Sequence, residues 1–306
     1  MLISIIGAGN VGGLLASRII DEDIADVALI DIKETIAQAK AADISDSLYF
    51  SKSSRSINAA SDFNQVKGSS IIVITAGFPR KPAMTREDLI SKNAALVKDI
   101  AEKIKPFLKD AIVITVTNPL DLMTYYFKKL TQIDSRRLIG MGSNLDSGRF
   151  ANLLASKLKT GIKNIEPVVI ASHGIDMLPL DRLTKSGNKP LTELLNDEEL
   201  KSLSKATVER GAQIVALYES GSAYFAPSAA ILEIIKSIVK DEKKTICACA
   251  YLNGEYGLKD ICIGVPLKIG KSGIEEIVAL PLDDKEKQAF LLSAQSIKEA
   301  LERLPV

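Results

Sequence analysis

Short apolar segments alternate with longer amphipathic segments along the first half of the chain. The short segments are rich in Ile, Val and Leu, as strands are, and span residues 2–6, 27–30, 71–75 and 112–117. The longer segments repeat apolar residues with the helical period and span residues 11–20, 35–48 and 89–107. Strict alternation of strands and helices is typical of parallel βαβ units, so this half predicts a doubly wound α/β fold.

The pattern changes from about Asn144 onward. We expect helices over residues 149–158, 198–218, 227–239 and 284–303, and strands over residues 167–171, 246–252, 261–269 and 275–279. Turn signals such as Asn253-Gly254 favour antiparallel pairing of the later strands. The chain therefore predicts two domains, a parallel α/β domain of residues 1–143 and an α+β domain of residues 144–306.

Composition and charge exclude several classes of protein. Of the 306 residues, 46% are hydrophobic and 25% are charged, which is ordinary for a globular chain. Lys and Arg number 39 and Asp and Glu 38, so no overall positive field would hold nucleic acid or an anionic membrane. The chain opens on an apolar strand without a basic leader, and no apolar run approaches about 18 residues, so we expect a cytoplasmic protein.

The three cysteines are too few for a disulfide scaffold. Cys247 and Cys249 share one face of a predicted strand, and Cys262 lies on the next one. A zinc site needs more Cys or His partners than the neighbouring sequence supplies. We therefore expect buried free thiols and no metal site.

A glycine-rich motif follows the first predicted strand and opens the first helix. It reads Gly7-Ala8-Gly9-Asn10-Val11-Gly12, and this context makes G-x-G-x-x-G a strong signal for a dinucleotide pyrophosphate at a helix N-terminus. Asp31 ends the second strand 19 residues after Gly12, where a carboxylate accepts hydrogen bonds from an adenosine ribose and repels a 2′-phosphate. The pair predicts a Rossmann fold that prefers NAD to NADP, although Lys33 nearby leaves room for some NADP tolerance.

Polar segments follow the carboxyl ends of the later strands, where ligands of doubly wound sheets bind. A loop at residues 77–89 carries Arg80, Lys81 and Arg86, and arginine suits bidentate contacts with carboxylates. Thr117-Asn118-Pro119 closes the next long strand. Each segment read alone is equally consistent with a solvated surface loop.

His173 is the only histidine of the chain and ends a predicted strand in the run A-S-H-G-I-D-M-L-P-L. Histidine is the side chain whose ordinary pKa lies near neutrality, so a proton-transferring enzyme would be expected to use it. Asp146 and Arg149 are three residues apart and project to one side of a helix start. They form a surface ion pair, or they meet His173 in one cleft.

Taken together, these motifs resemble the lactate/malate dehydrogenase superfamily, and most of all its lactate dehydrogenase-like branch of malate dehydrogenases. The resemblance covers essentially the whole length, and its marks in order are G-A-G-N-V-G, Asp31, G-F-P-R-K-P-A-M-T-R-E-D-L, V-T-N-P-L-D, N-L-D-S-G-R-F, S-H-G-I-D-M-L-P-L and G-S-A-Y-F-A-P-S-A-A. It implies an N-terminal Rossmann domain, a C-terminal α+β substrate domain and reversible hydride transfer between (S)-malate with NAD⁺ and oxaloacetate with NADH.

The resemblance also implies roles for the polar residues. His173 would donate and accept the proton, and Asp146 would orient its imidazole and favour the charged form. Arg149 would bind the C1 carboxylate of the substrate, and Arg86 would polarise the C2 carbonyl. Arg80 would bind the second carboxylate and so select malate over lactate. The small Ala223, where lactate enzymes have Thr, fits the larger substrate.

For the cofactor, the resemblance implies contacts of the motif from Gly7 to Gly12 with the pyrophosphate and of Asp31 with the adenosine ribose. Near the nicotinamide it implies Asn93, Val116, Thr117 and Asn118, of which Asn118 would also touch the substrate hydroxyl. A homodimer or homotetramer is implied as well.

The chain departs from the family pattern around the histidine. Ile175 replaces the usual acid and Asp176 follows one place later, while Ala171-Ser172 replaces a Gly-Gly pair. In addition, Ala83 and Gly148 stand where the family usually has Gly and Ala.

Three other functions are compatible with parts of the pattern. A dehydrogenase for lactate or another 2-hydroxy acid would share most motifs and differ in turnover of pyruvate. An NAD-dependent glycosidase would need a metal held by Cys and His, and here the cysteines lie far from the histidine in sequence. A regulatory protein would bind NADH without consuming it.

Overall fold

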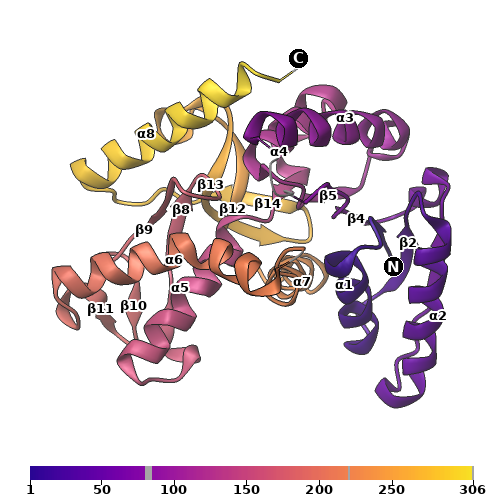
Figure 1. Cartoon of the computed structure of the whole chain (residues 1–306), viewed down its shortest axis with the longest axis horizontal. Coiled ribbons are helices and arrows are strands. Elements are labelled where there is room, and N and C mark those ends of the chain that lie inside the picture. Colours follow the sequence, from indigo (N-terminus) through magenta and orange to yellow (C-terminus); the bar gives the residue numbers. More distant parts are fainter. Residues whose placement is uncertain (80–84, 220, 305–306) are drawn as a thin grey trace.

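The computed structural model describes residues 1–79, 85–219 and 221–304, and in these residues one sheet of eleven strands runs through both halves of the chain (Figure 1). Its first six strands are parallel, in the spatial order β3-β2-β1-β4-β5-β6. Their bounds are β1 Leu2–Ile6, β2 Asp26–Ile30, β3 Ile57–Ala60, β4 Ile71–Ile74, β5 Ile112–Thr115 and β6 Leu138–Gly140. The prediction of a doubly wound parallel sheet is confirmed.

Four long helices connect these parallel strands. They are α1 Asn10–Asp21, α2 Glu34–Ser51, α3 Arg86–Ile104 and α4 Leu120–Thr131. Helices α1 and α2 pack together beside β2, and α3 and α4 pack together beyond β5 (Figure 1). Strands β4 and β5 are buried at every position, which explains their unbroken apolar sequences.

The second half extends the same sheet with antiparallel strands. Its elements are α5 Ser143–Leu158, β8 Val169–Ala171, β9 Met177–Pro179, α6 Asp197–Tyr218, α7 Phe225–Val239, β12 Lys244–Asn253, β13 Lys259–Gly270, β14 Gly273–Ile277 and α8 Asp284–Leu301. Strand β12 joins the parallel part where Cys249 pairs with Gly140 of β6. A separate small sheet contains β7 Ile165–Glu166, β10 Lys185–Ser186 and β11 Lys189–Pro190. The expected antiparallel pairing is therefore observed, but on a sheet shared with the first half.

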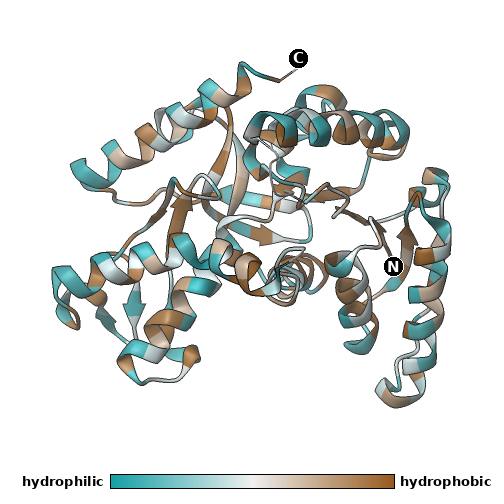
Figure 2. Cartoon of the chain, in the orientation of Figure 1, coloured by the Kyte–Doolittle hydropathy of each residue, from teal (hydrophilic) through white to brown (hydrophobic). Residues whose placement is uncertain are grey.

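Apolar side chains fill the space between sheet and helices. In Figure 2 the strands are mostly brown, whereas the outer helices carry both brown and teal residues. One large cluster of buried residues reaches from β1 to α8, and a smaller one, which contains Phe150, Leu154 and Leu200, joins α5 to α6. Within the described part of the chain, no helix is both long and apolar enough to span a bilayer.

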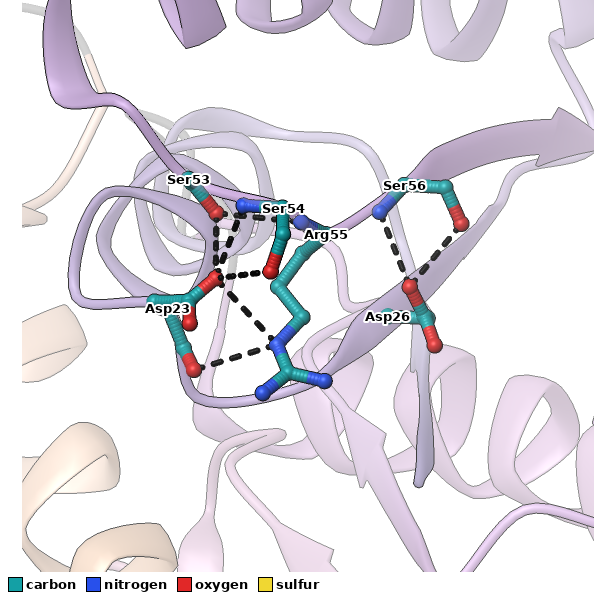
Figure 3. A network of polar contacts seen from close by, with 6 residues as sticks. All are labelled: Asp23, Asp26, Ser53, Ser54, Arg55 and Ser56. Atoms are coloured by element: carbon teal, nitrogen blue, oxygen red, sulfur yellow. Dashed lines mark hydrogen bonds and ion pairs between the residues drawn. The ribbon is translucent and has the colours of Figure 1, made fainter.

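A polar network joins the segments that lead into the amino ends of β2 and β3 (Figure 3). Asp23, in the turn before β2, accepts hydrogen bonds from the Ser53 and Ser54 hydroxyls and from the Ser54 amide. Asp26 accepts two more from Ser56, and these bonds lower the pKa of both carboxyls. The connection into β3 is thereby held against the start of β2, so that β2 delivers Asp31 at a defined place.

Strand β8 ends in a strained residue just before the histidine. Ala171 is fully buried and has a φ of 73°, a left-handed conformation that costs an L-residue about 1–2 kcal/mol. The unusual Ala171-Ser172 pair therefore places the strain two residues from His173.

We expect Ala171→Gly to raise the free energy of unfolding by roughly 1 kcal/mol, because glycine adopts a positive φ without a Cβ penalty. Chemical denaturation of the two proteins measures the difference. An unchanged or lower stability would mean that packing of the Ala171 methyl group outweighs the backbone strain.

Candidate active site

The glycine-rich loop between β1 and α1 is built by a close crossing of two backbone segments. A Cβ on Gly12 would lie 1.9 Å from the Gly7 carbonyl oxygen, and one on Gly7 would lie 2.5 Å from the Ala76 amide nitrogen. A Cβ on Gly9 would meet nothing within 4 Å. The loop is thus tight on the protein side and open at Gly9, next to the N-terminus of α1, as a dinucleotide pyrophosphate requires.

Asp31 follows β2 and binds this loop directly. Its Oδ2 accepts a hydrogen bond of 2.7 Å from the Ala8 amide, and its Oδ1 accepts one of 2.9 Å from the Lys33 amide. A carboxylate has about four acceptor sites, so both oxygens retain capacity for a ribose diol. The residues predicted to bind the pyrophosphate and the adenosine ribose therefore lie side by side.

Lys40, on α2, is a cation at the loop that the sequence pattern did not single out. Its Nζ donates a hydrogen bond of 2.7 Å to the Gly9 carbonyl, and a Cβ on Gly13 would lie 2.7 Å from the Lys40 Cδ. Burial lowers the pKa of Lys40, and the negative charge of Asp31 opposes that change. The signal was hidden because Lys40 stands in the middle of an amphipathic helix, where a lysine usually faces solvent.

The loops after β4 and β5 are joined by the side chain of Asn93. This residue of α3 is fully buried; its Oδ1 accepts from the Phe78 amide at 2.8 Å, and its Nδ2 donates to the Asn118 carbonyl at 2.7 Å. Thr117 is also buried and donates to the Ala76 carbonyl at 2.6 Å. The Asn118 side chain is exposed at the same edge. Asn93 and Thr117 thus position the segment from which Asn118 projects.

His173 is bound to Asp146 through its imidazole. Nδ1 lies 2.7 Å from Asp146 Oδ2, and the Asp146 side chain is fully buried while that of His173 is 15% exposed. The two residues come from the loop after β8 and from the first turn of α5. Because Asp146 engages Nδ1, the other ring nitrogen, Nε2, is the one left to exchange a proton with a substrate.

Arg149 binds the other oxygen of the same carboxylate. Its Nη1 lies 3.4 Å from Asp146 Oδ1, its side chain is 11% exposed, and its buried Nε has no hydrogen-bond partner among the described residues. The guanidinium packs against Gly211 of α6, where a Cβ would lie 3.3 Å from Nη1. Donor capacity of Arg149 therefore remains for an anionic ligand.

The electrostatic environment favours the protonated form of His173. Burial by itself would lower the pKa of the imidazole, but the charge and the hydrogen bond of Asp146, with a further contribution from Asp121, raise it above the ordinary value. Arg149 acts in the opposite direction. The net raised pKa suits a group that must both carry and release a proton near neutral pH.

Gly142, which precedes α5, provides the space in which the imidazole sits. A Cβ there would lie 3.0 Å from the Cβ of His173 and 2.4 Å from the Cδ2 of Leu120. The sequence contains no signal for this contact, because the two residues are 31 positions apart and no motif joins them.

Some of the expected site residues lie outside the described part of the chain. Arg80 lies outside the described residues, and so does Ala83. Arg86 begins α3, behind the capping box of Thr85 and Asp88, but its side chain is not among those described. Ala223 is half-buried just before α7.

The cysteines, Ile175 and Asp176 form no hydrogen bond with His173 among the described residues. All three thiols are free and buried, as expected, and burial raises the pKa of Cys247 to about 11. Ile175 is 75% exposed. Within the described ranges, no hydrogen bond joins Asp176 to His173, and no cluster of His, Cys, Asp and Glu suits a metal ion.

The first half of the chain forms a parallel sheet with a dinucleotide loop. In the second half a carboxylate, an imidazole and a guanidinium are bound together. These two features define a dinucleotide-dependent dehydrogenase. Two family models match the chain: the lactate/malate dehydrogenase NAD binding domain over residues 1–140, and the lactate/malate dehydrogenase alpha/beta C-terminal domain over residues 143–304. The chain therefore belongs to the lactate/malate dehydrogenase family.

Individual relatives agree over nearly the full length. A malate dehydrogenase of Dehalococcoides mccartyi is 42% identical, with 97% of this chain and 96% of that protein covered. The structure of the malate dehydrogenase from Aeropyrum pernix superposes with a TM-score of 0.96 at 38% identity, covering 99% and 98% of the two chains. The structure of a Cryptosporidium parvum lactate dehydrogenase, solved with lactic acid and nicotinamide adenine dinucleotide, superposes with a TM-score of 0.95 at 32% identity. The match covers 99% of this chain and 98% of that chain.

We expect Lys40→Met to raise the KM for NADH about tenfold with little change in kcat. The substitution keeps an unbranched stem against Gly13 but removes a cation beside the pyrophosphate loop, and a charged hydrogen bond contributes about 1.5–3 kcal/mol. Steady-state kinetics at saturating oxo acid measures the effect. Lys33→Met is the matched control, because only the backbone amide of Lys33 bonds to Asp31; equal effects of the two substitutions would contradict the assignment.

Proposed function

We propose that this chain is an NAD-dependent malate dehydrogenase of the lactate dehydrogenase-like type, which interconverts (S)-malate and oxaloacetate. The observation that carries the proposal is the buried carboxylate of Asp146, which binds the imidazole of His173 through one oxygen and the guanidinium of Arg149 through the other. Its full-length similarity to malate dehydrogenases supports the same reaction.

The residues of the chain divide the work of the reaction. Arg149 binds the C1 carboxylate of the substrate through its free donors, which places C2 and its oxygen at Nε2 of His173. In malate oxidation the neutral imidazole accepts the hydroxyl proton, and Asp146 stabilises the imidazolium that results. When bound, NAD⁺ accepts the hydride that leaves C2. In oxaloacetate reduction the imidazolium of His173 donates its proton to the C2 oxygen.

The open Gly9 and the carboxylate of Asp31 fit NAD as the cofactor. The first would approach the pyrophosphate and the second the adenosine ribose, where a negative charge disfavours the 2′-phosphate of NADP. Asn118 would complete the site on the nicotinamide side. For the substrate, we assign Arg86 to the C2 oxygen and Arg80 to the second carboxylate, on the family resemblance of their loop.

We also propose that the chain acts as a cytoplasmic homo-oligomer, with a domain boundary near residue 143. Large apolar side chains are exposed on two separate helices, with Tyr49 at 73% and Phe50 at 81% on α2 and Leu217 at 85% on α6. Exposed apolar surface of this kind is typical of contacts between subunits. In a symmetric oligomer a second copy of the chain would cover these side chains.

The substrate is tested by steady-state kinetics with oxaloacetate and pyruvate, each with NADH and NADPH. We expect kcat/KM to be highest for oxaloacetate with NADH. Arg80→Gln should lower the oxaloacetate-to-pyruvate preference at least about 30-fold, because it leaves a substrate carboxylate without its partner. Equal or better turnover of pyruvate by the unaltered enzyme would instead support a lactate dehydrogenase, and NADH binding without turnover would support a regulatory protein.

The raised pKa of His173 predicts opposite pH dependences for the two directions. Oxaloacetate reduction needs the protonated imidazole, so its kcat/KM should fall about tenfold per pH unit as the pH rises above this raised pKa. Malate oxidation needs the neutral imidazole and should lose activity below the same pKa. Profiles of kcat/KM against pH, recorded in both directions, test this prediction.

His173→Asn should abolish turnover, because it removes the group that exchanges the proton, while NADH fluorescence still reports binding of the cofactor.

A further inference from the structure

A second buried carboxylate lies beneath the histidine, and the reaction described above does not use it. Asp121 is the second residue of α4, and it is 2% exposed. A buried carboxylate is costly unless its environment stabilises the charge, so its presence beside a reacting group requires an explanation. Asp121 is the one acidic residue of α4.

The contacts of Asp121 converge on the loop that carries His173. Its Oδ2 accepts a hydrogen bond of 2.8 Å from the backbone amide of His173 and one of 3.0 Å from the Ser172 hydroxyl. The Ser172 amide in turn donates to the Ser293 hydroxyl of α8 at 3.1 Å. The loop that follows the strained Ala171 is therefore held from two helices that belong to opposite halves of the chain.

The remaining surroundings of Asp121 are neutral. Cys249 of β12 and Cys262 of β13 lie nearby, and Oδ1 of Asp121 is buried without a hydrogen-bond partner among the described residues. Burial raises the pKa of Asp121, whereas the Cys249 thiol, the His173 amide and the charge of His173 lower it. Among the described residues Asp121 forms no ion pair with Lys or Arg, so the imidazolium of His173 is its cationic neighbour.

We propose that Asp121 is a positioning residue for His173, fixing the backbone of the histidine and stabilising its imidazolium together with Asp146. The two carboxylates then act on different parts of one residue. Asp146 orients the ring through Nδ1, and Asp121 fixes the point from which the ring projects. Asp121 belongs to the V-T-N-P-L-D segment and acts on the histidine loop from another helix.

The charges that face His173 set the direction of the effect. Asp146 and Arg149 face it from α5, and Asp121 faces it from α4. Removing one of two negative charges lowers the proton affinity of the imidazole, and freeing the backbone amide loosens the ring. A loss of orientation costs turnover more than substrate binding, since the carboxylate clamp at Arg149 is untouched.

The test is a titration of the single histidine by NMR, together with kinetics, in the full-length enzyme. We expect Asp121→Asn to lower the pKa of His173 by about 0.5–1 unit and kcat about tenfold, with KM for oxaloacetate and NADH within about twofold. Asp121→Ser is the second neutral variant, because it is smaller and can still accept a hydrogen bond from the His173 amide.

Asp260→Asn is the matched control. Asp260 is bonded to Tyr125 and Lys129 of the same helix, and its loss should leave the titration of His173 unchanged. An unchanged pKa of His173 in both Asp121 variants overturns the proposal, whatever happens to kcat, since lost packing alone would lower turnover without moving the titration. Because NMR reads the pKa without turnover, this outcome is distinct from failure of the malate dehydrogenase assignment, on which the proposal rests.

Discussion

The buried carboxylate of Asp146 is the interaction on which the rest of the site depends. It binds an imidazole and a guanidinium with its two oxygens, so one residue orients both the His173 ring and the Arg149 side chain. Partners on both oxygens compensate the burial of the Asp146 charge, and these contacts tie α5 to the loop after β8. A change that displaced His173 or Arg149 would leave one oxygen of the buried Asp146 carboxylate without a partner.

The continuous sheet is what brings these partners to the nucleotide loop. Strand β12 pairs with β6 through Cys249 and Gly140, and β13 pairs with β8 through Gly264 and Ala171. Strand β8, which ends before the histidine, thereby belongs to the same sheet as the parallel strands that carry the dinucleotide loop. Both the shared sheet and helix α8, which bonds to the histidine loop, couple the cofactor half to the proton-transferring half.

Most of the fold could be predicted, because alternating apolar segments and amphipathic helices carry strong periodic signals. Helix α4, whose positions from Leu120 to Phe127 are all buried, was missed although Asp121, Thr124 and Lys128 recur at helical spacing. Strand β3 was missed because its sequence, Ile-Asn-Ala-Ala, contains a single large apolar residue, and β6 because it has three residues. The cost of missing α4 was functional: Asp121, which holds the histidine loop, lies in that segment.

For the site, motifs with a fixed spacing drew attention to the glycine loop, Asp31, Asp146, Arg149 and His173, and the family resemblance supplied the roles that we propose for them. Each of these residues stands in a short motif that is recognisable without its partner, although His173 and Asp146 pair across 27 positions. Contacts of Lys40, Gly142 and Asp121 join elements far apart along the chain, and no pattern records them. Only tertiary packing decided them, because burial and proximity, and hence the pKa of His173, arise when the helices close over the sheet.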